Sequence, residues 1–262
     1  MPISQHEKAV RFRALHHGKP FVIANPWDAG SAKVLATVGF SALATTSSGF
    51  AFTLGKSDGG ATLVEVLEHT RAISDATDLP VSVDLENGYG DAVQTVLGAA
   101  EAGAVGGSIE DFDPGSGISG FGPSVERVAA AAEAAHGLDF PFTLTARAEN
   151  HIRGNPDLDD TIARLLAFER AGADVLFAPG LGVDELRAVR AATSLPLNAL
   201  ARPGVDLKAL FDAGAQRVSV GGALTWVAIG AMADAAERLL AGDLSALARG
   251  NARRVGDLLG RG

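Results

Sequence analysis

Residues 81–90 read VSVDLENGYG, and the rest of the chain can be understood from this stretch. Its apolar start predicts a short buried strand, which breaks at Gly88. Side chains at positions i and i+2 of a strand share one face, so Asp84 and Glu86 are expected side by side. Two neighbouring carboxylates repel each other unless a cation or a proton lies between them. The stretch therefore predicts an acidic site at a strand end that requires a cation.

On both sides of this strand, short apolar runs typical of strands alternate with longer helical patterns. Three helix ends share a signature, EAGAVGGSI, RAGADVLFA and DAGAQRVSV, in which a left-handed glycine stops the helix before the next strand. Eight strands are expected, at residues 21–27, 42–48, 81–86, 107–112, 143–149, 174–178, 197–201 and 217–220. Eight such units in about 250 residues predict a closed (β/α)8 TIM barrel with parallel strands.

A doubly wound open sheet is the alternative fold. That fold usually carries a G-x-G-x-x-G turn after its first strand, whereas this chain has NPWDAGSAK there. No linker or shift in composition divides the sequence, so we expect one domain over residues 1–262, with the barrel core at about 20–225. The last helices, expected at residues 223–240 and 244–259, would pack on the barrel or on a neighbouring subunit.

The composition excludes several classes of function. The net charge of −9 argues against a general binder of nucleic acids or anionic membranes. The chain has no cysteine, which excludes disulfides, cysteine-ligated metals and a cysteine nucleophile. The amino terminus lacks the apolar core of a signal peptide, and no apolar run is long enough to span a bilayer. We expect a cytoplasmic protein whose partner is a small molecule.

In such barrels the active site lies at the carboxyl ends of the strands. Asp84 and Glu86 end the third strand and Glu110 ends the fourth, so three carboxylates should meet near the mouth, with Arg147 opposite them. Oxygen ligands without histidine or cysteine favour Mg²⁺, with Mn²⁺ as the alternative. The competing interpretation is that Arg147 pairs with Glu110 or Glu149 as a buried ion pair.

Smaller groups at the same end of the barrel are candidate substrate contacts. Ser47, Ser48 and Gly49 would let backbone N–H groups approach a substrate oxygen, although a tight turn explains them equally well on spacing alone. Trp27 ends the first strand and Asn198 lies on the seventh.

Two loops after the strands are also expected over the mouth. Asp58 lies in the loop after the second strand, where most aspartates are solvated turn residues. Residues 111–123, DFDPGSGISGFGP, form a glycine-rich segment of the length used for active-site lids. It contains no histidine, lysine or arginine, so we expect it to exclude water and to contribute little acid–base chemistry.

A family resemblance covers roughly residues 20–225. The chain resembles the isocitrate lyase/phosphoenolpyruvate mutase superfamily in a set of motifs that occur in the same order: NPWDAGSAK (25–33), TTSSG (45–49), VDLENGYGD (83–91), GSIED (107–111), TARAEN (145–150), AGADVLFAPG (171–180) and PLNAL (196–200).

The resemblance implies roles for these residues. Asp84 would bind Mg²⁺ directly, and Glu86 and Glu110 would hold its waters, although the family usually has aspartate where Glu86 stands. Ser47, Ser48 and Gly49 would cradle a 2-oxo acid, with Arg147 and Asn198 as further contacts. Asp58 matches a loop aspartate near the reacting centre and, with Arg147, is expected to be catalytic.

The implied mechanism is stabilisation of a pyruvate enolate while a bond to its C3 breaks or forms. The lyase branches carry a cysteine in the lid and the phosphomutase branch relies on lysine and asparagine there; residues 111–123 have none of these. We therefore expect a lyase or decarboxylase acting on a small 2-oxo acid such as oxaloacetate. The alternatives are a phosphonopyruvate-type phosphomutase or hydrolase, and a barrel that binds a 2-oxo acid with little turnover. The family also implies a homodimer or homotetramer that exchanges its last helix.

Overall fold

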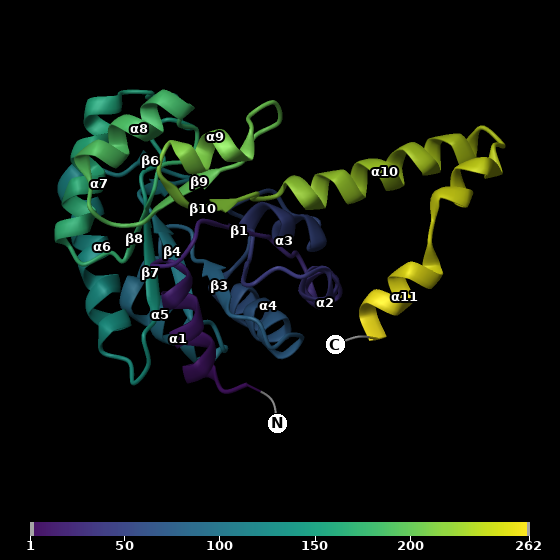
Figure 1. The fold of residues 1–262 in the computed structure, drawn as a ribbon, viewed down its shortest axis with the longest axis horizontal. Coiled ribbons are helices and arrows are strands. Elements are labelled where there is room, and N and C mark those ends of the chain that lie inside the picture. Colours follow the sequence, from purple (N-terminus) through teal and green to yellow (C-terminus); the bar gives the residue numbers. More distant parts are fainter. Residues whose placement is uncertain (1–2, 261–262) are drawn as a thin grey trace.

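The computed structural model describes residues 3–260, in which eight parallel strands form one sheet. Around the sheet the order is β1, β10, β9, β8, β7, β4, β3, β2, and a parallel bridge between Ala24 and Leu43 joins β1 to β2. The predicted (β/α)8 barrel is confirmed (Figure 1). Its strands are β1 (Phe21–Ile23), β2 (Leu43–Ala44), β3 (Val81–Asp84), β4 (Gly106–Glu110), β7 (Thr143–Arg147), β8 (Val175–Phe177), β9 (Leu197–Leu200) and β10 (Ala215–Ser219).

Helices follow the strands and cover the outside of the barrel (Figure 1). They are α2 (Ala29–Val38), α3 (Ser47–Thr53), α4 (Leu63–Asp75), α5 (Ala92–Glu101), α6 (Phe121–His136), α7 (Leu158–Arg170), α8 (Val183–Ala192) and α9 (Leu207–Asp212). The three helix ends with the shared signature do stop at left-handed glycines, with φ of 93° at Gly103, 100° at Gly172 and 103° at Gly214. A side chain there would be strained, which is why glycine recurs.

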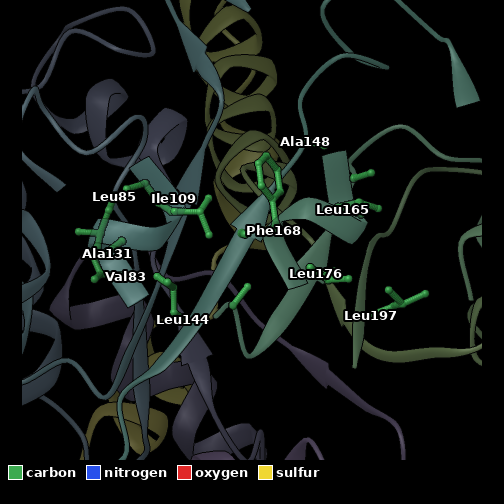
Figure 2. Packing of buried hydrophobic residues seen from close by; sticks show 14 of the residues in the cluster. Val83, Leu85, Ile109, Ala131, Leu144, Ala148, Leu165, Phe168, Leu176 and Leu197 are labelled. Carbon is green, nitrogen blue, oxygen red and sulfur yellow. The ribbon is translucent and has the colours of Figure 1, made fainter. Parts of the chain in front are cut away.

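The main hydrophobic core lies between the strands and these helices. Outward-facing strand residues such as Val83, Ile109 and Leu144 pack against α6 and α7, which contribute Ala131 and Phe168 (Figure 2). Because strand side chains alternate, the neighbouring residues of the same strands point into the barrel. Those neighbours include Ser82, Asp84 and Arg147, so the polar positions are turned toward the barrel interior and its mouth.

The carboxyl-terminal segment differs in part from the prediction. α10 (Ala223–Leu240) matches the expected helix and extends away from the barrel, while α11 (Ala252–Gly260) returns beside α2 (Figure 1). The expected single helix at 244–259 is wrong, because Gly250 has extended backbone and separates the 3-10 helix Leu244–Arg249 from α11. Within residues 3–260, no helix has both the length and the apolar character that crossing a membrane demands.

An amino-terminal helix, α1 (Gln5–Leu15), packs Phe12 beside Ile23 and Val105. His16, which follows it, is buried next to Arg217 of β10: its Nδ1 lies 2.9 Å from the Phe12 carbonyl and its Nε2 lies 3.2 Å from Arg217 Nη1. The arginine must donate to Nε2, so Nδ1 carries the ring proton and His16 is neutral. Burial, together with the Arg217 charge, lowers the pKa of His16 to about 3.

This arrangement predicts acid sensitivity. Unfolded His16 takes up a proton below its ordinary pKa of 6.5, and the folded side chain does so only near 3. The contribution of neutral His16 to the free energy of unfolding is therefore fully present above pH 6.5 and falls as the pH decreases toward 3. Between about pH 7.5 and about pH 5, wild type should lose about 2 kcal/mol more unfolding free energy than His16→Gln, which keeps a donor and an acceptor. Urea unfolding measures this, and equal losses in the two proteins would contradict it.

Candidate active site

Two adjoining cavities lie at the carboxyl ends of the strands. The first, of about 210 Å³, extends from the mouth into the barrel. The second, of about 200 Å³, lies beneath the loop that follows β4. Ser47, Asp58, Arg147 and Arg153 line both. The strand ends therefore bring most of the predicted site residues to one connected region: Asp84, Ser48 and Asn198 line the first cavity, and Glu86 and Glu110 line the second.

Arg147, at the end of β7, is the centre of this region. Its Nη1 lies 2.8 Å from Asp84 Oδ1, and its Nη2 lies 2.7 Å from Glu110 Oε2 and 2.8 Å from Glu149 Oε1. Burial alone would disfavour its charge, but the three carboxylates raise the pKa of Arg147 above its ordinary value. The ion pair that competed with the metal-site interpretation is thus present, and it includes Asp84 as well as both glutamates.

One guanidinium does not neutralise this many acids. Burial raises the pKa of Glu110 to about 8, even though Arg147 opposes the shift. Burial also raises the pKa of Glu86 to about 7; the Tyr89 hydroxyl, 2.7 Å away, opposes this rise, and the charges of Asp84 and Asp58 add to it. Both glutamates would ionise more readily if positive charge were added to the site.

The turn after β3 holds Glu86 in an unusual conformation. Its φ is 45°, in the left-handed region that side chains other than asparagine, aspartate and glycine rarely adopt. At Gly88, with φ 82°, a side chain would be strained by the left-handed backbone, and its Cβ would lie 2.9 Å from the end of the Ile109 side chain. The Tyr89 hydroxyl then reaches back to Glu86. The GYG turn predicted to end the strand therefore also orients the glutamate.

The predicted metal ligands can be compared with this geometry. Among residues 3–260, no group of three or more acidic or histidine side chains is disposed around one metal position, because Arg147 separates Asp84 from Glu110. The donor chemistry nevertheless fits a hard divalent cation. Asp84, Glu86 and Glu110 offer only carboxylate oxygens, and burial disfavours the charge on two of them unless a cation is near.

Ser47 and Gly49, two of the predicted substrate contacts, have different surroundings. The second predicted strand ends early, and Ser47 begins α3 after the capping residue Thr46. The Ser47 N–H lies 3.3 Å from Asp84 Oδ2, so the serine faces the acidic cluster, whereas the Gly49 N–H donates to the Thr46 hydroxyl. A Cβ on Gly49 would lie 2.6 Å from Thr225 Oγ1, which shows tight packing on α10.

Trp27 and Asn198 have different surroundings. Trp27 lies beside Gly49 and lines neither cavity; its carbonyl contacts the His69 ring at 3.0 Å. Asn198 lines the first cavity, but both ends of its amide are engaged, with Ser219 at 2.9 Å and Arg217 at 2.8 Å. Asn198 therefore lies deeper in the barrel than the acidic cluster.

The glycine-rich segment after β4 is not an irregular loop. It forms an antiparallel hairpin of β5 (Phe112–Asp113) and β6 (Gly117–Ile118) before α6 begins. Arg153 lies 3.8 Å from the centre of the Phe112 ring, and Asn87 Nδ2 lies 2.6 Å from Asp113. The hairpin is thus attached to the mouth through a cation–π contact and a hydrogen bond.

Two residues at the mouth were not selected as site candidates from the sequence. Glu149 is fully buried, and its second oxygen, which lacks a hydrogen bond, lies 3.3 Å from Arg153 Nε. Arg153 connects the cavities, Glu149 and the hairpin. It lies in a loop beyond the strand, where no alternation of side chains indicates which way the arginine points. Glu149 was visible as one of the polar residues at the end of the fifth predicted strand.

Comparison with known proteins agrees with this architecture. The profile of the family described as phosphoenolpyruvate phosphomutase matches residues 12–240. An uncharacterised Mycobacterium tuberculosis protein is 32% identical over 216 residues, which are 80% of this chain and 81% of the relative. The crystal structure of a provisionally assigned lyase/mutase from Burkholderia cenocepacia J2315 is 47% identical, with a TM-score of 0.93 over 97% of this chain and 95% of that one. An oxaloacetate decarboxylase of Bradyrhizobium diazoefficiens is 38% identical over 148 residues, 52% of this chain and 50% of the relative.

Proposed function

Because this chain belongs to the phosphoenolpyruvate phosphomutase family, in the isocitrate lyase/phosphoenolpyruvate mutase superfamily, we propose that it is a Mg²⁺-dependent carbon–carbon lyase that decarboxylates oxaloacetate or a close 2-oxo dicarboxylate. The similarity to oxaloacetate decarboxylases supports this choice, although the chain spans only about half the length of the relative.

The observation that carries the proposal is the charge imbalance at the mouth. Five carboxylates, those of Asp58, Asp84, Glu86, Glu110 and Glu149, line the two cavities, against the guanidinium groups of Arg147 and Arg153 near the mouth and of Arg217 deeper in the barrel. A dianionic substrate would be repelled from such a site unless a divalent cation joined it. Asp84, Glu86 and Glu110 would hold Mg²⁺, whose chemistry is to polarise the substrate carbonyl as a Lewis acid.

The chain itself would position the substrate and stabilise charge. Ser47 and Ser48 line the first cavity and would donate to the 2-oxo acid group. Arg147 Nη1 has one N–H directed to Asp84 and a second for the oxygen that becomes an enolate when the C3–C4 bond breaks and CO₂ leaves. Asp58, which lines both cavities, supplies the carboxyl group through which a proton returns to C3 to give pyruvate. The Phe112 hairpin, attached by Arg153, limits the entry of water.

A direct assay tests the reaction. Purified protein with Mg²⁺ should convert oxaloacetate to pyruvate and CO₂ faster than Mg²⁺ alone, and EDTA should remove the difference until Mg²⁺ or Mn²⁺ is added back. A rate equal to that of the metal alone would exclude this substrate. The family description favours a phosphonopyruvate-type mutase or hydrolase as the second candidate, and loss of the phosphonopyruvate signal in a ³¹P NMR experiment would support it instead.

We also propose that the chain works as a homodimer or homotetramer. α10 extends from the barrel with Trp226, Val227, Met232 and Leu240 between 49% and 92% exposed. Several exposed apolar side chains along one projecting helix are typical of a subunit interface. Light scattering that gave the mass of a single chain would contradict the proposal.

A further inference from the structure

Below the mouth, the interior of the barrel is hollow and polar. Barrels of this fold usually fill that layer with branched aliphatic side chains. Here the first cavity continues down past Ser82 of β3, Ser108 of β4, Asn198 of β9 and Ser219 of β10 to Arg217, two residues earlier on β10. Small hydroxyl side chains thus leave open a space that large apolar ones would occupy, and an arginine lies at its edge.

Arg217 is buried, with 5% of its surface exposed, and its side-chain hydrogen bonds within residues 3–260 are to neutral groups. Nε donates to Asn198 Oδ1 at 2.8 Å, Nη1 donates to His16 Nε2 at 3.2 Å, and Nη2 donates to Thr145 Oγ1 at 3.0 Å. A guanidinium has five N–H groups, and these bonds use three of them, one on each nitrogen. One N–H on each terminal nitrogen is left for another acceptor.

This buried cation has no anionic partner in the described part of the chain. Burial lowers the pKa of Arg217 to about 9, and no carboxylate opposes that shift. Arg147 is buried with three carboxylates, and Arg164 is held by Asp111 at 3.0 Å and by Asp160 at 2.9 Å. A buried charge without a counter-ion is costly, so the unpaired Arg217 points to an anion that binds beside it.

The position of Arg217 limits what can reach it. Its guanidinium contacts Thr145, which precedes Arg147 by two residues on β7. Two residues of a strand span roughly 7 Å, so Arg217 lies about one side-chain layer below the reaction site. The whole cavity measures about 210 Å³, which admits a halide ion or one end of a small acid but no nucleotide.

We infer that this hollow binds one small anionic group, a halide ion or a carboxylate, with Arg217 as its counter-ion. The two uncommitted N–H groups would donate to the anion. The hydroxyls of Ser82 and Ser108 line the same space and complete its shell. The carboxylate has two sources: a free small acid such as formate, or the distal carboxylate of the substrate. Only the second source rests on the proposed function.

Thermal unfolding of the full chain in EDTA tests the site without requiring activity. Sodium bromide or sodium formate would be titrated at constant ionic strength against sodium gluconate, an anion too large for the hollow. Wild type should show a saturable rise in Tm of roughly 5–10 °C at a hundredfold excess over Kd. Arg217→Met should abolish the rise, whereas Arg187→Met, which removes an exposed cation paired with Asp184, should keep it.

A second variant keeps the test decisive if Arg217→Met does not fold. Ser108→Val fills the hollow and leaves Arg217 in place, so it should weaken the apparent affinity for bromide at least tenfold. In crystals soaked in bromide, an anomalous peak should lie beside the Arg217 guanidinium. The inference is overturned if wild type shows no saturable rise in Tm or if Ser108→Val responds to bromide as wild type does. It is also overturned if the anomalous peaks of bromide lie only at the mouth.

Kinetics then separate the two sources. If the distal carboxylate of the substrate occupies the hollow, bromide should raise the KM for oxaloacetate in proportion to its concentration and leave kcat unchanged. If a free anion occupies it, KM should not change while the rise in Tm persists. Both results support the site. Absence of any turnover would count against the proposed reaction alone, because the Tm measurement needs no substrate.

Discussion

Replacing Arg147 with methionine should lower the free energy of unfolding by about 3–5 kcal/mol, because it leaves three buried carboxylates without their shared cation. Asp84, Glu110 and Glu149 are each at most 13% exposed at the side chain, so water cannot replace the guanidinium. For a chain of this size the loss corresponds to roughly 10 °C in Tm. Activity should be lost as well, since Arg147 is the proposed donor to the enolate oxygen.

Three comparisons make this prediction specific. Arg187→Met breaks an ion pair between side chains that are 55% and 95% exposed, so it should cost less than about 0.5 kcal/mol. Adding Glu110→Gln to Arg147→Met removes one of the stranded charges and should restore part of the stability. Arg147 opposes the rise in the pKa of Glu110, so in Arg147→Met that glutamate should take up a proton at a still higher pH, and the deficit should shrink as the pH falls. A deficit no larger than that of Arg187→Met would refute the central role of Arg147.

Asp84→Asn should reduce kcat/KM for the 2-oxo acid substrate by roughly a thousandfold, or about 4 kcal/mol in the transition state. The change keeps the shape of the side chain and removes the charge that would bind Mg²⁺ directly. Asp84 also accepts from Ser47 N–H and from Arg147, so the asparagine carbonyl retains some of the local order. The loss should therefore appear in kcat and in Mg²⁺ affinity rather than in the fold, as circular dichroism and a Mg²⁺ titration of the rate would show.

The control for this variant is Asp91→Asn, seven residues along in the same segment. Asp91 caps α5 by accepting from Gln94 N–H at 3.0 Å, and asparagine caps helices equally well. Activity should be unchanged in that protein. If Asp84→Asn kept activity within about tenfold of wild type, the assignment of Asp84 as the direct metal ligand would be abandoned.

Much of the architecture could be predicted from the sequence because it depends on local patterns. Left-handed glycines such as Gly103 and Gly172 mark helix ends through a backbone conformation that other residues avoid. The boundaries at 244–259 were less predictable: extended backbone at Gly250 divides a pattern that reads as one helix. The hairpin at 112–118 was not predicted within the glycine-rich segment, because its two-residue strands are too short to show alternation.

The candidate site was predictable to the extent that strand periodicity places side chains. Asp84, Glu110 and Arg147 end neighbouring strands, so their meeting at the mouth follows from the order of the strands. Arg153 could not be selected this way, because it lies in a loop and reaches the site through contacts with Glu149 and Phe112. Trp27 ends a predicted strand yet lines neither cavity, because the chain turns into α2 before its side chain can face the mouth.

By itself, the sequence determined the barrel, the strand ends that form its mouth and the excess of acid there, because alternation and residue chemistry are local properties. Only the tertiary structure decided which charges are partners. In VSVDLENGYG, the cation nearest to Asp84 is Arg147, which also holds Glu110 and Glu149, while Glu86 is turned to Tyr89 by a left-handed backbone. Arg217, in contrast, has no carboxylate partner among residues 3–260. Such pairings depend on distances between strands far apart in the chain, which no local pattern encodes.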